Sequence, residues 1–210
     1  MSTFLENQNW RYATKKFDAL KKINDQDLGF LKQAIQLSTS SYGLQLYKVI
    51  DVQNPEIRSK LQAPSWGQSQ IVDASHLFVF ASFTHVNDQD IDTYLTNVAA
   101  TRNIPVAALK GYGDFMKNSI SAKSDADKII WNEKQSYLAL ANLLNAAAEL
   151  KIDVCPMEGF DAKQYNDILE LDAMGLTATV VATIGYRAQD DATQHNIKVR
   201  KSIENLFTNI

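Results

Sequence analysis

The most informative segment of this chain is Cys155-Pro156-Met157-Glu158-Gly159-Phe160-Asp161. It follows a long apolar stretch with helical spacing and the lead-in Lys151-Ile152-Asp153-Val154, which has the composition of a strand. Proline followed by glycine at this spacing fixes the end of a strand with backbone N–H groups that point outward. Main-chain donors presented in this way can hydrogen-bond the edge of a flat heteroaromatic ring.

The composition is that of a globular protein, and it predicts a single domain spanning residues 1–210. The hydrophobic fraction of 45% allows a sizeable core, and the net charge of −3 gives no reason to expect nucleic acid as a partner. One cysteine excludes an intrachain disulfide. We see no signal peptide and no run long enough to cross a membrane, so the sequence predicts a cytoplasmic protein without a membrane partner.

Helical and strand patterns occur in no regular alternation, which predicts the α+β class. Helices are expected from the cap at Asn24 to about Ser38, over much of 88–121 with breaks at 103–105 and 111–113, and over 128–150 and 162–169. Strands are expected over 47–52, 76–81, 153–157 and 177–186. The 128–150 helix is apolar around much of its surface, so Trp131 and Tyr137 are expected in the core.

Basic residues occur near both ends of the chain. Arg11, Lys15 and Lys16 form one group, and Lys198 and Arg200 form another in a tail that we expect to be extended. In an extended segment, residues two apart point the same way, and the planar guanidinium of arginine suits a phosphate. The two groups together could hold one phosphomonoester; from spacing alone, two solvated surface patches remain the alternative.

Five motifs occur in order along the chain: Arg11…Thr14-Lys15…Phe17-Asp18, Ser38-Thr39-Ser40-Ser41 with Gln45, Asp73-Ala74-Ser75-His76, Pro156-Met157-Glu158-Gly159-Phe160-Asp161 and Lys198-Val199-Arg200. In this order they resemble FMN-dependent nitroreductases, in the branch of oxygen-insensitive NAD(P)H nitroreductases and dihydropteridine reductase-like enzymes. Each motif is weak alone, but five in order are specific, and they cover nearly the whole chain.

The resemblance implies a nitroreductase-like α+β fold. Its central sheet would be mixed but mostly antiparallel and flanked by helices, and a C-terminal extension would be exchanged across an intertwined homodimer. It also implies tightly bound FMN, with NAD(P)H as a transient co-substrate. The activity would be ping-pong, two-electron hydride transfer to nitroaromatics, quinones or related small acceptors. A flavin-binding protein for storage or sensing, and an interaction protein that has lost the cofactor, remain alternatives.

By position, the resemblance assigns Arg11, Lys198 and Arg200 to the FMN phosphate and Lys15 to the N1 and C2=O edge of the flavin ring. Backbone N–H groups of Glu158 and Gly159 would face N5 and O4. Pro156 would pack on one ring face, and Ser40 and Ser41 would come from the other subunit. The complete cofactor-binding set that the resemblance implies is Arg11, Tyr12, Ala13, Lys15, Ser40, Ser41, Gly43, Gln70, Pro156, Met157, Glu158, Gly159, Lys198 and Arg200.

Three positions depart from the family pattern. Ala13 stands where serine is common, Gly43 where asparagine is common, and Gln70 where some relatives carry lysine. By this resemblance, the first change would remove a hydrogen bond to the phosphate or ribityl chain, the second would loosen a contact beside the flavin, and the third would weaken the stabilisation of reduced flavin. No side chain is expected to act as a catalytic residue, and the scattered histidines predict no metal site.

Overall fold

The computed structural model describes residues 3–210. Its four strands form one sheet in the order β1-β2-β4-β3, and every ladder is antiparallel. The strands are β1 (Tyr47–Asp51), β2 (His76–Phe83), β3 (Asp153–Met157) and β4 (Leu176–Gly185). A parallel element is present only as an isolated bridge between Ala13 and Val154 among the described residues. The predicted α+β class and the predicted strands are confirmed.

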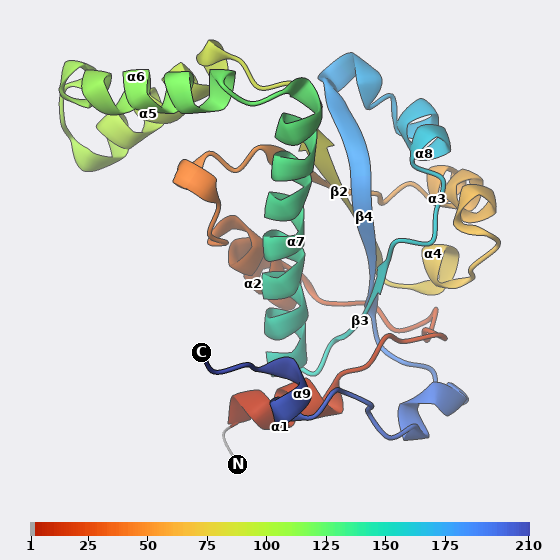
Figure 1. Cartoon of the computed structure of the whole chain (residues 1–210). Helices are drawn as coiled ribbons and strands as arrows, with labels where there is room; N and C mark the ends of the chain where they lie inside the picture. Colours follow the sequence, from red (N-terminus) through yellow and green to blue (C-terminus); the bar gives the residue numbers. More distant parts are fainter. Residues whose placement is uncertain (1–2) are drawn as a thin grey trace.

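Helices cover both faces of the sheet (Figure 1). The α-helices are α1 (Thr3–Trp10), α2 (Asp25–Gln36), α3 (Pro55–Gln62), α4 (Gln70–Asp73), α5 (Asp88–Arg102), α6 (Lys110–Ser121), α7 (Asp125–Glu149), α8 (Ala162–Leu169) and α9 (Ile203–Leu206). Short 3-10 turns are η1 (Ser41–Gly43), η2 (Ala63–Ser65), η3 (Val106–Leu109), η4 (Asp172–Met174) and η5 (Ala192–His195). None of the helices in residues 3–210 is long and apolar enough to cross a membrane.

Strand β2 contributes to a hydrophobic core on each face, because successive side chains of a strand point to opposite sides. Leu77, Val79 and Ala81 pack into the core that is completed by α3, α4 and α8. Phe78 and Phe80 pack into the core that is completed by α2 and α7. The continuous apolar run of this strand is therefore explained by its burial on both faces, as the sequence predicts.

The helix starts follow from side-chain caps. The side chain of Asn24 accepts a hydrogen bond from the backbone N–H of Asp27 (2.8 Å), and the Ser124 hydroxyl accepts one from that of Asp127 (3.1 Å). Such caps satisfy donors that have no partner inside the helix. They place the starts of α2 and α7 as the sequence indicates, with α7 beginning three residues earlier than the expected position 128.

Residues 88–121 form a helical arm of α5, η3 and α6 that extends away from the sheet (Figure 1). The expected break at 103–105 is confirmed, because Asn103 adopts a left-handed conformation and ends α5. The expected break at 111–113 is wrong, since these residues lie in the first turn of α6. Gly113 serves packing instead: a Cβ there would lie 2.6 Å from Cδ1 of Leu95, so glycine lets α6 approach α5 closely.

Candidate functional site

A cavity of about 330 Å³ lies between the two ends of the chain, and we call it the terminal cavity. It is lined by Asn9, Trp10, Arg11, Tyr12, Ala13, Thr193, Gln194, Asn196, Ile197, Lys198 and Arg200. Five residues of the predicted cofactor-binding set therefore line the same cavity within a single chain. The extended tail needed for this arrangement is present, because residues 196–201 leave η5 without forming a regular element.

The three cations of the terminal cavity are close enough to repel one another. Burial lowers the pKa of Arg11, and the charge of Arg200 lowers it further. Burial likewise lowers the pKa of Lys198, with added repulsion from Arg11 and Arg200. Like charges held together in this way are relieved by an anion between them, and guanidinium and ammonium groups are the usual phosphate ligands of proteins. The donor set fits a phosphate.

Lys198 also ties the tail to the N-terminal helix. Its ammonium group donates to the main-chain carbonyls of Gln8 and Arg11, at the C-terminal end of α1. A cation in this position satisfies carbonyls that have no partner in the helix. Because an ammonium group carries three N–H donors, one remains to reach into the cavity.

An aromatic and ionic stack forms the wall behind the cavity. The guanidinium carbon of Arg187 lies 4.4 Å from the ring centroid of Trp10 and 4.5 Å from that of Tyr12. The same guanidinium holds the buried carboxylate of Asp153 through contacts of 2.6 and 2.9 Å. Sequence reasoning missed Arg187, because nothing along the chain relates it to residues 10–12.

The N-terminal segment continues along the edge strand β3. Ala13 forms a parallel bridge with Val154, which carries Lys15 toward the next residue of that strand, Cys155. Burial raises the pKa of the Cys155 thiol, while the charge of Lys15 and a hydrogen bond with Gln70 lower it. Lys15 and Gln70, predicted from distant parts of the sequence, are thus brought together against β3.

The loop that follows β3 is held from two sides. From the first side, the Gln68 amide donates to the carbonyl of Gly159 (3.0 Å), and the backbone N–H of Asp161 donates to the carbonyl of Pro64 (2.8 Å). From the other side, the Tyr137 hydroxyl donates to the Glu158 carboxylate (2.6 Å). The expectation that Tyr137 lies in the core is wrong, since its side chain is 39% exposed.

Trp131, the other aromatic residue expected in the core, is partly buried. It packs edge-on against Tyr42, with ring centroids 6.1 Å apart. Of the remaining predicted residues on β3, Met157 is buried and Pro156 is partly exposed. The strand therefore offers Pro156, not Met157, to a molecule lying along the sheet edge.

Ser40, Ser41 and Gly43 lie away from the terminal cavity. The backbone N–H of Ser41 donates a hydrogen bond to the Gln135 side chain on α7 (2.8 Å). Gln8 of α1 donates one to Asn145, further along the same helix. Ten residues of helix separate these two points by about 15 Å. Figure 1 shows the orange segment 41–43 well apart from α1. One chain alone does not bring these three residues to the cavity.

Gly43 has a structural reason for departing from the family pattern. Its φ is +81°, in the region that side chains rarely adopt, and a Cβ would lie 2.7 Å from the hydroxyl oxygen of Tyr94. Asparagine tolerates a positive φ better than most residues, but its Cβ would still meet the Tyr94 hydroxyl. The glycine is therefore fitted to the fold, whatever contact it makes with a cofactor.

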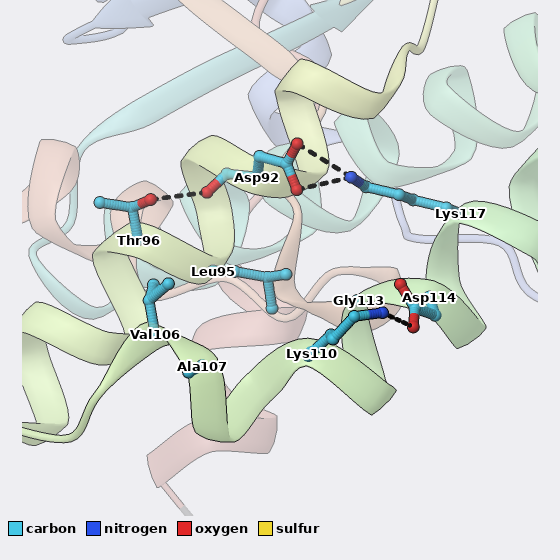
Figure 2. Close-up of a pocket in the computed structure, with 9 residues that line it drawn as sticks. All are labelled: Asp92, Leu95, Thr96, Val106, Ala107, Lys110, Gly113, Asp114 and Lys117. Atoms are coloured by element: carbon cyan, nitrogen blue, oxygen red, sulfur yellow. Dashed lines mark hydrogen bonds and ion pairs between the residues drawn. The ribbon is translucent and has the colours of Figure 1, made fainter.

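A further cavity of about 400 Å³ lies between α5 and α6 in the helical arm (Figure 2). Its charged side chains are paired with one another: Lys117 with Asp92 (2.7 Å) and Lys110 with Asp114 (2.5 Å). No residue of the predicted cofactor-binding set lines it. The terminal cavity is the better candidate, because its cations converge without an acidic side chain among its lining residues.

Comparison with known proteins identifies the family of the chain. Residues 9–186 match the family described as "Nitroreductase family". The chain belongs to the nitroreductase family. A curated relative, "Putative NAD(P)H nitroreductase YfkO" of Bacillus subtilis (strain 168), is 34% identical over 213 residues, which cover 96% of this chain and 95% of the relative.

Solved structures share the nitroreductase fold at low sequence identity. The structure titled "putative nitroreductase ydfN" from Bacillus subtilis aligns with a TM-score of 0.88 at 19% identity, covering 99% of this chain and 98% of that one. A putative nitroreductase from Exiguobacterium sibiricum 255-15, described in complex with FMN, aligns with a TM-score of 0.85 at 15% identity, covering 100% and 98%. The predicted nitroreductase-like fold is confirmed.

The relatives are named as enzymes, so the expectation that this nitroreductase is an enzyme of the NAD(P)H-dependent oxidoreductase class is confirmed at the level of the family. Within residues 3–210, no cluster of three His, Cys, Asp or Glu side chains is placed to hold a metal ion.

Proposed function

We propose that this nitroreductase is an FMN-dependent enzyme that uses NAD(P)H to reduce nitroaromatics, quinones or related acceptors by ping-pong, two-electron hydride transfer. The observation that carries the proposal is the convergence of Arg11, Lys198 and Arg200 on the terminal cavity. The FMN described in the Exiguobacterium relative and the NAD(P)H in the name of the Bacillus relative support it. We take residues 1–210 as one FMN-binding domain.

At the phosphate end, the chain would supply positive charge and oriented hydrogen-bond donors. Arg11 and Arg200 present planar donors suited to two phosphate oxygens, and Lys198 adds a compact charge beside them. Each charge-assisted hydrogen bond contributes about 1.5–3 kcal/mol. Tyr12 and Ala13 would shape the wall next to the phosphate, and the alanine leaves one hydrogen bond fewer than a serine would give.

At the ring end, the edge of β3 would align the cofactor. FMN, when bound, supplies the redox chemistry by accepting two electrons from the nicotinamide and passing them to the acceptor. Lys15 would place a positive charge beside the ring, and Gln70 a neutral amide, both next to Cys155. Pro156 would cover part of one face, while main-chain donors of Glu158 and Gly159 would point at its edge. Met157 is buried and would hold the strand in place.

The proposed site is completed by a second copy of the chain. Ser40, Ser41 and Gly43 do not reach the terminal cavity of their own chain, so they would serve the partner's cofactor. The tail exposes apolar side chains that a partner would cover: Ile197, Val199, Ile203, Leu206, Phe207 and Ile210. Strand β1 lies at the sheet edge, beside a groove of about 310 Å³ that includes Ile35, Val49 and Phe78. This edge and groove suit an exchanged tail.

The absorption spectrum of the purified protein tests the proposal. We expect a yellow protein that releases FMN on denaturation. Under anaerobic conditions, NADH or NADPH should bleach the flavin absorbance, and a quinone should restore it. A protein that is purified without flavin and does not take up added FMN would contradict the proposal. Bound flavin that neither nicotinamide bleaches would favour storage or sensing instead. A monomer by sedimentation would contradict the exchanged tail.

A further inference from the structure

The carboxylate of Asp191 connects the two ends of the chain directly behind the terminal cavity. Its side chain belongs to a residue that is only 2% exposed. Sequence reasoning gave it no role, and it lies outside the cofactor-binding set. Two residues that line the cavity, Tyr12 and Thr193, are hydrogen-bonded to it.

The two oxygens of Asp191 serve two different segments. Oδ2 accepts hydrogen bonds from the Tyr12 hydroxyl (2.8 Å) and from the backbone N–H groups of Lys15 (2.9 Å) and Lys16 (3.2 Å). Oδ1 accepts from the backbone N–H of Thr193 (3.0 Å) and from its hydroxyl. One carboxylate thus fixes the segment that carries Arg11 and Lys15 against the turn that leads to Lys198 and Arg200.

Only a carboxylate can accept hydrogen bonds from the donors of both segments. An ionised aspartate accepts with both oxygens, whereas asparagine accepts with one and presents an NH2 group with the other. In Asp191→Asn, that NH2 group would face N–H and O–H donors on one side. The donors on that side would lose their acceptor, which is costly because these hydrogen bonds are partly buried.

We propose that Asp191 is a positioning residue that holds the N-terminal and C-terminal cations in the arrangement required by the cofactor phosphate. It acts through Tyr12, Thr193 and the backbone of Lys15, and it does not touch the phosphate itself. This inference rests on the proposed FMN function. Its particular claim is that Asp191 governs the phosphate end of the site more strongly than the ring end, which it reaches only through the backbone of Lys15.

Binding of FMN and of riboflavin, which lacks the phosphate, separates these two ends. Flavin-free protein is titrated with each flavin, and quenching of flavin fluorescence gives the Kd. Asp191→Asn should weaken FMN binding about tenfold or more, because the cations of the two termini would no longer be held around the phosphate. It should weaken riboflavin binding about threefold or less, because only the backbone of Lys15 links Asp191 to the ring end. Asp190→Asn is the matched control, since Asp190 is exposed and pairs only with exposed Lys16 among the described contacts. It should leave both values unchanged.

The outcomes are distinct. Unchanged FMN affinity in Asp191→Asn, or equal weakening for FMN and riboflavin, would overturn the role of Asp191 while leaving the FMN function standing. Wild-type protein that binds neither flavin would overturn both. If Asp191→Asn does not fold, Tyr12→Phe decides: it removes one donor to Oδ2 and should weaken FMN binding about threefold with riboflavin binding unchanged. Equal affinity for FMN in Tyr12→Phe would then overturn the inference.

Discussion

The hydroxyl of Tyr137 donates a 2.6 Å hydrogen bond to the carboxylate of Glu158, which joins the middle of α7 to the loop after β3. Burial and this hydrogen bond raise the pKa of Tyr137 to about 12, so the phenol stays protonated at neutral pH. The donor is therefore always available. The contact connects the longest helix to the residue whose main chain is proposed to face the flavin ring.

Tyr137→Phe should slow flavin reduction by NAD(P)H about three- to tenfold, because one hydrogen bond that orients the Glu158 loop is lost. Stopped-flow absorbance measures this rate. FMN affinity and the free energy of unfolding should change little, since Tyr137 is 39% exposed and its partner Glu158 is exposed. Tyr186→Phe is the matched control, because it keeps the ring that Lys21 packs over. An unchanged reduction rate in Tyr137→Phe would mean that the loop does not depend on this contact.

Arg200→Ala should weaken FMN binding about tenfold or more and leave the melting temperature nearly unchanged. The side chain is exposed, so its removal costs little packing, but the terminal cavity loses one of three cations. Isothermal titration gives the affinity and scanning calorimetry the stability. Lys201→Ala removes a neighbouring exposed charge that does not line the cavity and should have little effect. Equal affinities for wild type and Arg200→Ala would contradict the phosphate assignment.

Arg187→Ala should lower the free energy of unfolding by about 3–5 kcal/mol, because it leaves the buried carboxylate of Asp153 without its cationic partner. Urea denaturation measures the change. Arg187→Lys should recover only part of the loss. An ammonium group cannot form the bidentate contact with Asp153, and it has no planar surface to pack over the rings of Trp10 and Tyr12. Full recovery by lysine would show that charge alone, not the planar stack, stabilises this wall.

Gly43→Ala should destabilise the protein by about 1–3 kcal/mol, because φ is +81° and the new methyl group would collide with the Tyr94 hydroxyl. Thermal unfolding checks this. Gly29→Ala is a matched control inside α2, where nothing lies within 4 Å of the added Cβ. That substitution should stabilise by about 0.5–1 kcal/mol. A Gly43→Ala variant with the stability of wild type would show that the 41–43 turn adjusts to the methyl group at no cost in free energy.

Asp51 should contribute to the loss of stability in acid. Burial raises the pKa of its carboxyl, but hydrogen bonds from His76, Gln53 and Lys32 outweigh burial and hold the pKa well below its usual range. Because the folded pKa lies below the unfolded value of about 3.9, this stabilisation is complete above that value. It is lost as the pH falls toward the folded pKa.

Asp51→Asn should therefore unfold more easily than wild type at neutral pH, and its stability should depend less on pH below about 4. Urea denaturation at several pH values measures both effects. A variant with the same acid dependence as wild type would show that other carboxylates account for it.

Short-range features were predictable from the sequence. The caps at Asn24 and Ser124 act over three residues, and the apolar run of β2 identifies a strand buried on both faces. Residues 111–113 show the limit of this reasoning. Two glycines predict a break, but the close approach of Leu95 makes glycine necessary inside the helix.

The sequence by itself determined the strands and the main helices, the nitroreductase resemblance and the two groups of cations, because these depend on residue types and spacing along the chain. Only the tertiary structure decided that Arg11 and Arg200 share one cavity, that Arg187 packs over both Trp10 and Tyr12, and that Asp191 connects the two ends. Apart from the contact between Asp191 and Thr193, those contacts join residues more than 170 positions apart. They form when the sheet and helices pack, so no local pattern encodes them.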